Sequence, residues 1–252
     1  MIARVAHLCR HPIKSIGFEE VGSAELAPAR AFPFDREWAV AHEAAAFEGA
    51  PDTWQPKRNF LRGAAAEGLM AVSCTSDPAA RRVWLRHPVA GEITLAPDDG
   101  ADGARLIAWL APLWPANRPM PRRVVAAPGV ALTDVPEPWV AVLNLASNRA
   151  LGQRLGQSLS IHRWRGNIWI DGLDPWAEFD LVGRRLRLGD AVLEVMEPIT
   201  RCQATMANPE TGSRDADTLG ALEAGYGHQD FGVYARVVEG GTVALGAGVE
   251  VE

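Results

Sequence analysis

The sequence RRLRLGDAVLEVMEPITRCQAT, residues 184–205, predicts a β-hairpin that leads to a single cysteine. Residues 184–188 alternate between arginine and leucine, as a half-buried strand does, and the Gly-Asp pair that follows supplies a two-residue turn. The apolar run 191–196 is the return strand. Pro198 lacks the N–H that a sheet ladder needs, so we expect this strand to end near it. The hairpin then presents Cys202.

Cys202 stands next to the fixed positive charge of Arg201, with hydroxyls close by at Thr200 and Thr205. A neighbouring cation favours the thiolate, which is both the nucleophilic and the metal-binding form of cysteine. The alternative is that Cys202 is a small buried hydrophobe, as most lone cysteines are. The local residues leave both interpretations open.

The composition is that of an ordinary globular protein. The chain has 252 residues, 48% of them hydrophobic and 22% charged, enough for one large domain or two modest ones. A net charge of −6 argues against general nucleic-acid binding. Three cysteines without a CxxC pair argue against a disulfide framework or a zinc or iron–sulfur site, and indicate a reducing compartment. We find no signal peptide and no membrane span, so a cytoplasmic protein without a membrane partner is expected.

Short runs of alternating or apolar residues, separated by turns, predict a mostly β fold of the α+β class. Residues 82–87 and 92–96 flank a turn with Pro and Gly and predict a hairpin. Residues 104–114 have apolar positions at helical spacing. Three prolines in residues 115–121 mark a candidate linker between two halves.

Two short segments of the N-terminal half carry candidate anion ligands. Lys14 and Ser15 lie in a turn-like segment that is either an ordinary solvated turn or a contact for phosphate. Arg36 follows, and it either pairs with Asp35 or Glu37 on the surface or acts as a second anion ligand.

Two segments of the C-terminal half are also candidates. In residues 162–172, Arg163, Arg165 and Asn167 share one side of the chain if it is extended, and they suit a ligand rich in heteroatoms. The alternative is a basic edge strand. Ser147 is expected to cap a short helix, and the N-terminus of a helix also attracts phosphate.

Taken in chain order, these motifs resemble MOSC-domain proteins, a family named after the C-terminal part of molybdenum cofactor sulfurase. The resembling segments are residues 12–15, 35–38, 144–149, 163–167, 189–190, 200–205, 208–212 and 231–234. The resemblance implies a β-barrel MOSC domain at residues 119–252, preceded by a smaller β-rich region at residues 1–118 that is similar to the family's N-terminal β-barrel region.

The resemblance also implies a molybdenum cofactor of the molybdopterin type. In the branch that includes the mitochondrial amidoxime-reducing component and the bacterial YcbX proteins, the cysteine that matches Cys202 ligates molybdenum. By the same resemblance, the positions at or near the cofactor are Lys14, Ser15, Arg36, Arg165, Asn167, Thr200 and Arg201. We add Ser147, Arg163 and Thr205 as candidate contacts, because hydroxyls and guanidinium groups suit the phosphate and the pterin. Pyridoxal phosphate is not expected.

The chain departs from the family pattern at Asn208-Pro209, where Asp-Pro is common, and at residues 54–60, where relatives often carry a Gln-Arg pattern. No cysteine-rich ferredoxin module like that of YcbX-type relatives follows the barrel. We therefore expect a molybdenum-dependent oxidoreductase that reduces N-hydroxylated or N-oxide small molecules with electrons from a separate ferredoxin- or flavoprotein-type reductase. The alternatives are a sulfur carrier or cofactor-handling protein with a persulfide on Cys202, and a barrel that only binds a partner.

Overall fold

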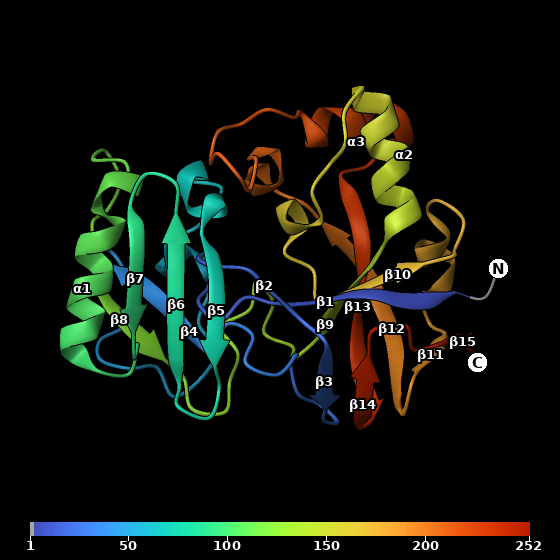
Figure 1. Ribbon diagram of the computed structural model, residues 1–252, viewed down its shortest axis with the longest axis horizontal. Helices are drawn as coiled ribbons and strands as arrows, with labels where there is room; N and C mark the ends of the chain where they lie inside the picture. Colours follow the sequence, from blue (N-terminus) through green and yellow to red (C-terminus); the bar gives the residue numbers. More distant parts are fainter. Residues whose placement is uncertain (1–2) are drawn as a thin grey trace.

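The computed structural model describes residues 3–252, which form a mostly β structure of the α+β class, as predicted. Figure 1 shows a smaller body, with the strands of residues 38–126, beside a larger body that holds the first strands of the chain and the strands of the C-terminal half. No helix among the described residues is long and apolar enough to cross a membrane. The strands are β1 (Arg4–Arg10), β2 (Glu19–Val21), β3 (Ser23–Leu26), β4 (Trp38–His42), β5 (Ser73–Asp77), β6 (Arg82–His87), β7 (Gly91–Leu95), β8 (Pro121–Ala126), β9 (Val140–Asn144), β10 (Ile168–Asp171), β11 (Arg185–Leu188), β12 (Ala191–Thr200), β13 (Asp230–Glu239), β14 (Gly241–Ala244) and β15 (Val249–Val251). The α-helices are α1 (Gly100–Leu110), α2 (Leu145–Leu155) and α3 (Thr218–Tyr226).

The larger sheet has the strand order β15-β11-β12-β13-β9-β10-β1-β2. Val5 N donates to Ala247 O (2.9 Å) and Val249 N donates to Ala3 O (2.9 Å), so the segment before β15 pairs with β1. These bonds join β15, at one end of the row, to β1, so the strands from β15 to β1 form a ring and β2 lies beyond it. The interior is filled by buried Val, Leu, Ile and Ala side chains from every strand of this ring.

The predicted hairpin is present as β11, the turn and β12. The expectation that its second strand ends near Pro198 is wrong, because β12 continues to Thr200. β11 pairs with β12 only from Ala191 to Glu194, so the later part of β12 keeps one edge free of β11. A proline fits at such an edge, and the pairing with β13 shifts register directly after it.

The smaller body combines the sheet β5-β6-β7, the pair β4-β8 and helix α1 around a second apolar core. The predicted hairpin is confirmed as β6 and β7. The helix begins at Gly100 rather than residue 104, because the Asp99 carboxylate accepts from the N–H groups of Ala101 (2.8 Å) and Asp102 (3.0 Å). It ends at Leu110, and a 3₁₀ turn, Ala111–Leu113, follows directly.

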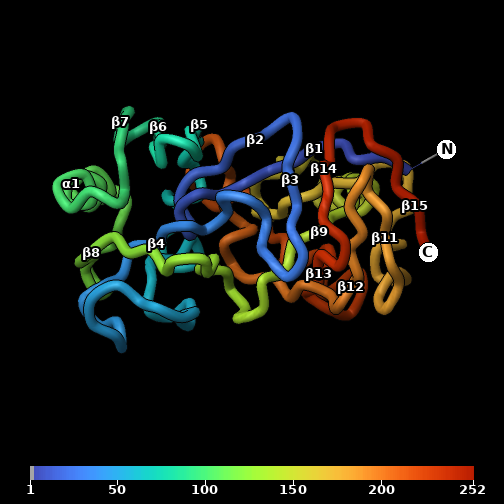
Figure 2. The backbone as a smooth tube through the Cα atoms, turned by 90° about the horizontal axis from the view of Figure 1, so that it is seen from below, coloured from blue at the N-terminus to red at the C-terminus, as the bar shows by residue number. Residues whose placement is uncertain are grey.

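Strands on the two sides of residue 118 pair with each other. β1, from the start of the chain, lies between β10 and β2, whereas β8, which begins at Pro121, pairs with β4. Figure 2 shows this exchange from below: β1 to β3 lie against the C-terminal strands, and β8 lies with β4. Pro121 is therefore a strand residue and not part of a linker, and the division into residues 1–118 and 119–252 stays a prediction.

Candidate functional site

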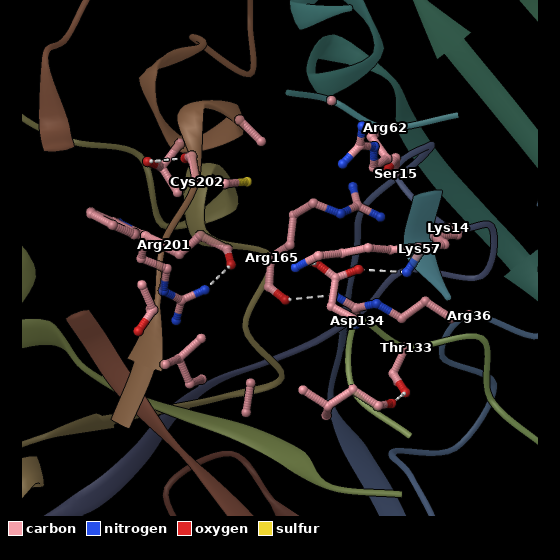
Figure 3. A pocket seen from close by; sticks show the side chains of 18 of the residues that line it. Lys14, Ser15, Arg36, Lys57, Arg62, Thr133, Asp134, Arg165, Arg201 and Cys202 are labelled. Carbon is pink, nitrogen blue, oxygen red and sulfur yellow. Dashed lines mark hydrogen bonds and ion pairs between the residues drawn. The ribbon is translucent and has the colours of Figure 1, made fainter. Parts of the chain in front are cut away.

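A cavity of about 340 Å³ is lined by stretches that are far apart in the sequence. Figure 3 shows Lys14, Arg36 and Lys57 on one side and Cys202 on the other, with Arg165 between them. The candidate residues that line it are Lys14, Ser15, Arg36, Arg163, Arg165, Asn167, Thr200, Arg201, Cys202 and Thr205. The fold thus gathers ten of the eleven candidate residues at one site.

Cys202 is exposed, so the alternative of a buried hydrophobe is wrong. Cys9 and Cys74 are buried, and this burial raises the pKa of both thiols. Among the three cysteines, Cys202 is therefore the one whose sulfur is open to a ligand, and it lines the cavity.

Thr205 holds the backbone of Cys202 in place through two hydrogen bonds. It lies in a 3₁₀ turn, Gln203–Met206, that begins directly after Cys202. Both the N–H (3.1 Å) and the hydroxyl (3.0 Å) of Thr205 donate to Cys202 O, and the hydroxyl also contacts the hydroxyl of Thr218 (2.7 Å) at the start of α3. Thr205 is buried. It positions the cysteine through its backbone, and its hydroxyl is already engaged within the protein.

The guanidinium of Arg201 is half-buried and packs against aromatic rings. It donates to Phe231 O (2.7 Å) and Trp164 O (2.8 Å) and lies over both rings. Burial lowers its pKa to about 10. No carboxylate of the described residues lies within 4.0 Å of it. Thr200, the preceding residue, donates its hydroxyl to Asp230 (2.5 Å).

Lys14 is buried and contacts a residue that sequence reasoning missed. Its ammonium donates to Leu132 O (2.9 Å) and Asp134 (2.5 Å), and the other oxygen of Asp134 lies 3.8 Å from the Lys57 ammonium. Burial lowers the pKa of Lys14. The charges of the two lysines outweigh the desolvation of Asp134 and hold the pKa of its carboxyl below the ordinary value. Lys14 and Asp134 are 120 residues apart, so no local pattern could have indicated this pair.

Arg36 pairs with Asp35, but the pair is buried and not on the surface as one alternative proposed. The guanidinium contacts the carboxylate of Asp35, which is 2% exposed, and also donates to Arg165 O (3.0 Å). Although its own burial opposes ionisation, the Asp35 carboxyl has a pKa held below the ordinary range by Arg36 and by hydrogen bonds. Glu37 pairs instead with Arg81 (3.1 Å).

The segment around Arg165 is not an extended strand, so that expectation is wrong. Ile161–Trp164 form a 3₁₀ turn that Ser160 caps, and Arg165 then takes a left-handed conformation, with φ 50°. The turn separates the two arginines. The guanidinium of Arg163 donates to Asp215 (2.6 Å) and Met206 O (3.2 Å), while that of Arg165 donates to Gly17 O (3.2 Å).

Arg165 has a half-buried guanidinium without a carboxylate partner among the described residues. Among the described residues, no ion pair reaches it, and its contacts are backbone carbonyls such as Ile13 O (3.4 Å). Burial first, and then the charge of Arg36, lower its pKa to about 9. An uncompensated cation of this kind is costly to bury and favours an anionic ligand.

Asn167 and Ser147 are held within the protein. The Asn167 side chain accepts from Ala141 N (3.1 Å) and donates to Cys9 O (3.2 Å), and so joins β9 to β1. Ser147 lies outside the cavity, and the prediction that it caps α2 is wrong. The cap is Asn144, which accepts from Ala146 N (2.9 Å), because it stands directly at the end of β9. The Ser147 hydroxyl instead donates to buried Glu178 (2.7 Å).

Three of the candidate contacts have left-handed backbones: Ser15 (φ 62°), Arg36 (φ 52°) and Arg165 (φ 50°). This conformation is uncommon for residues other than glycine and is typical of functional sites, where the surrounding structure compensates for the strain. All three line the same cavity.

The cavity is strongly electropositive, although the whole chain is acidic. Its carboxylates are Asp35, Asp134 and Glu197, and the first two are paired with cations. Its cations are Lys14, Arg36, Lys57, Arg62, Arg163, Arg165 and Arg201. Such a lining suits an anionic ligand that carries several hydrogen-bond acceptors.

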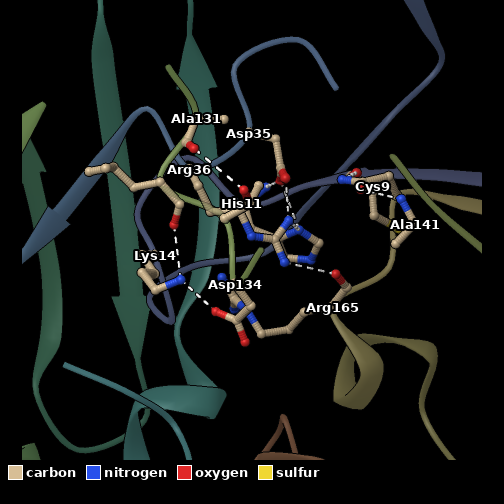
Figure 4. A network of polar contacts seen from close by, with 12 residues as sticks. Cys9, His11, Lys14, Asp35, Arg36, Ala131, Asp134, Ala141 and Arg165 are labelled. Atoms are coloured by element: carbon tan, nitrogen blue, oxygen red, sulfur yellow. Dashed lines mark hydrogen bonds and ion pairs between the residues drawn. The ribbon is translucent and has the colours of Figure 1, made fainter. Parts of the chain in front are cut away.

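A buried histidine in contact with Asp35 and Arg36 makes stability depend on pH (Figure 4). His11 is fully buried and contacts Asp35 (3.0 Å) and Arg36 (3.2 Å) through Nδ1. Burial, with the charges of Arg165 and Arg36, lowers its pKa well below the ordinary 6.5, despite the opposing effect of Asp35. As the pH falls below 6.5, the unfolded chain therefore takes up a proton that the folded chain does not.

We expect the free energy of unfolding to decrease as the pH falls below 6.5, with His11 contributing up to about 1.4 kcal/mol per pH unit. In His11→Asn this contribution is absent, so urea unfolding between pH 5 and 7 should give a flatter profile. The parent protein, measured under the same conditions, gives the reference slope. A parent slope in His11→Asn contradicts the prediction.

Comparison with known proteins gives one family match. Residues 132–250 match the family model of the MOSC domain. Molybdenum cofactor sulfurase of Drosophila grimshawi is 30% identical over 136 residues, 54% of this chain and 16% of that protein. The protein of the same name from Caenorhabditis elegans is 36% identical over 76 residues, 29% of this chain and 10% of that protein. The chain thus spans less than a fifth of the length of these curated relatives.

Two solved structures are more distant in sequence. The YuaD protein of Bacillus subtilis is 11% identical, with a TM-score of 0.47 over 100% of this chain and 96% of that one. YiiM of Geobacillus stearothermophilus is 17% identical, with a TM-score of 0.34 over 45% of this chain and 53% of that one.

Proposed function

The chain carries a MOSC domain at residues 132–250, and from this we propose that its cavity binds a molybdenum cofactor of the molybdopterin type, with Cys202 as the metal ligand. One observation carries the proposal: the exposed sulfur of Cys202 opens into a cavity lined by seven cationic side chains. The name of the curated relatives, molybdenum cofactor sulfurase, supports the same cofactor.

The residues present fit this group. A molybdopterin carries a phosphate dianion and a pterin rich in donors and acceptors, and a thiolate is a soft ligand that suits molybdenum. Arg165 and Arg201 are half-buried cations without carboxylate partners among the described residues, so an anionic ligand compensates charges that the protein leaves unpaired. Ser15 and Arg62 also line the cavity and supply further donors.

We further propose an oxidoreductase that removes oxygen from N-hydroxylated or N-oxide small molecules. The bound cofactor supplies the two-electron redox chemistry. The oxygen leaves as water, which consumes two protons and two electrons, and a separate ferredoxin- or flavoprotein-type reductase in the cytoplasm provides the electrons. Within this chain, Cys202 holds the metal, the cationic side chains orient the cofactor, and Thr205 fixes the backbone of Cys202.

A second candidate is a sulfur carrier or a cofactor-handling protein. The exposure of Cys202 favours it, because an accessible thiol can receive a persulfide sulfur from a cysteine desulfurase, and the curated relatives are sulfurases by name. In that function the same cations hold the cofactor next to the persulfide.

The deciding experiment measures molybdenum and pterin per chain in protein purified from a host that makes the cofactor. We expect near-stoichiometric amounts of both. The absence of both from folded protein contradicts cofactor binding. Intact-mass measurement after incubation with a cysteine desulfurase and cysteine then separates the two functions. A 32 Da adduct that Cys202→Ala lacks favours the sulfur carrier, and no adduct favours the oxidoreductase.

A further inference from the structure

The carboxylate of Asp134 lies among three cations of the cavity (Figure 3). One of its oxygens accepts from the Lys14 ammonium (2.5 Å), and the other lies 3.8 Å from the Lys57 ammonium. The guanidinium of Arg36 is the third cation. Despite desolvation, the charges of all three hold the pKa of the Asp134 carboxyl below the ordinary value, so it is ionised at neutral pH. A protein anion thus occupies a place that suits the anionic group of a ligand.

The two partners of the ion pair between Lys14 and Asp134 differ in exposure. The Lys14 side chain is 2% exposed, whereas 49% of the Asp134 side chain is exposed. A buried cation without a nearby anion costs free energy, so the Lys14 ammonium needs an anionic partner. The Asp134 carboxylate, in contrast, can turn into solvent without a large desolvation cost. It can therefore give up its place to an anion that arrives from outside.

The backbone on the N-terminal side of Asp134 is held in place, so an exchange of this kind needs only a rotation of the side chain. The N–H of Leu132, a buried residue, donates to Arg36 O (2.9 Å). The indole N–H of Trp54 donates to Thr133 O (3.0 Å). These contacts do not involve the Asp134 carboxylate and remain when it turns away from the cations.

We propose that Asp134 is an internal counter-anion of the cavity, and that a phosphate group displaces its carboxylate from Lys14 and Lys57 when it binds. A phosphate dianion brings two negative charges where the carboxylate brings one, and it accepts more hydrogen bonds, so the exchange favours phosphate. The competition lowers the affinity for phosphate and keeps the buried ammonium paired when no ligand is bound. The proposal rests on the proposed function in one respect, because the phosphate of the cofactor is the natural ligand that it assigns to this place.

The test is calorimetric titration with inorganic phosphate of protein purified from a host that lacks the cofactor. Asp134→Asn keeps a hydrogen-bond acceptor for Lys14 but removes the competing charge. We expect this variant to bind phosphate about threefold to tenfold more tightly than the parent protein. Lys57→Met removes a cation on the exposed side of the site and should weaken phosphate binding by about the same factor.

Glu197→Gln is the matched control, because Glu197 lines the same cavity with an exposed side chain and forms no ion pair within the part of the chain that the structure describes. If Asp134 competes for the phosphate site itself, removing the charge of Glu197 should leave the phosphate affinity within about twofold of the parent value. Parent or weaker phosphate binding in Asp134→Asn overturns the proposal, and so does an equal gain in Glu197→Gln.

The outcome for this proposal can be separated from the outcome for the proposed function, since the titration needs no molybdenum. Tighter phosphate binding by Asp134→Asn, in a protein that takes up neither molybdenum nor pterin, would reject the proposed function and keep the competition by Asp134. Full cofactor content of the parent protein, together with equal phosphate affinities of the parent and Asp134→Asn, would do the reverse.

Discussion

Cys202→Ala is expected to lose at least nine-tenths of the bound molybdenum while its melting temperature stays at the parent value. The metal is lost because the thiolate is the only ligand that this proposal assigns to the protein, and removing a metal ligand costs more than the tenfold to hundredfold typical of its supporting contacts. Stability is unchanged because the side chain is exposed and packs in no core. Elemental analysis and thermal unfolding measure the two effects.

Cys74→Ala is the matched control, and it should show the opposite pattern. Cys74 is buried in the core of the smaller body, so the substitution leaves a small cavity and costs about 1 kcal/mol of stability. Its thiol does not line the functional cavity, and the molybdenum content should equal that of the parent protein. Retention of molybdenum in Cys202→Ala would show that another group holds the metal.

The second large effect is expected for Arg165→Met, in which ligand binding and stability change in opposite directions. Methionine keeps most of the length of the side chain but removes a half-buried cation that no carboxylate of the described residues compensates. The hydrogen bonds lost are long, 3.2 Å and 3.4 Å to backbone carbonyls. We therefore expect the melting temperature of cofactor-free Arg165→Met to equal or exceed that of the cofactor-free parent protein.

The same substitution should reduce pterin and molybdenum content by a factor of ten to one hundred, because a charge-assisted hydrogen bond contributes about 1.5–3 kcal/mol. Arg82→Met, at an exposed position on β6, is the control and should change neither property. A fall in melting temperature together with parent cofactor content would assign Arg165 to the support of the fold and not to ligand binding.

Local sequence patterns determined the features that depend on neighbouring residues. The alternation of residues 184–188, the Gly-Asp turn and the apolar run that follows indicated the hairpin, because strand periodicity and turn preference act within a few residues. The same reasoning found β6 and β7. It failed at Pro198, because whether a strand tolerates proline depends on which of its edges is paired.

For the site, the sequence indicated which residue types bear chemistry but not where they point. In the sequence, Arg163 and Arg165 looked equivalent. In the structure, the turn capped by Ser160 separates them, so Arg163 pairs with Asp215 and Arg165 has no carboxylate partner among the described residues. Ser147 looked like a helix cap, but Asn144 takes that place, and Ser147 lies outside the cavity.

Contacts between distant segments were decided by the tertiary structure alone. The pair of Lys14 and Asp134 and the charge of the cavity both depend on which segments the fold brings together. Side-chain pairing across a hundred residues leaves no periodicity in the chain, because it is set by strand order and register after local structure has formed. The sequence by itself therefore determined the hairpin and its cysteine, and the tertiary structure decided what surrounds that cysteine.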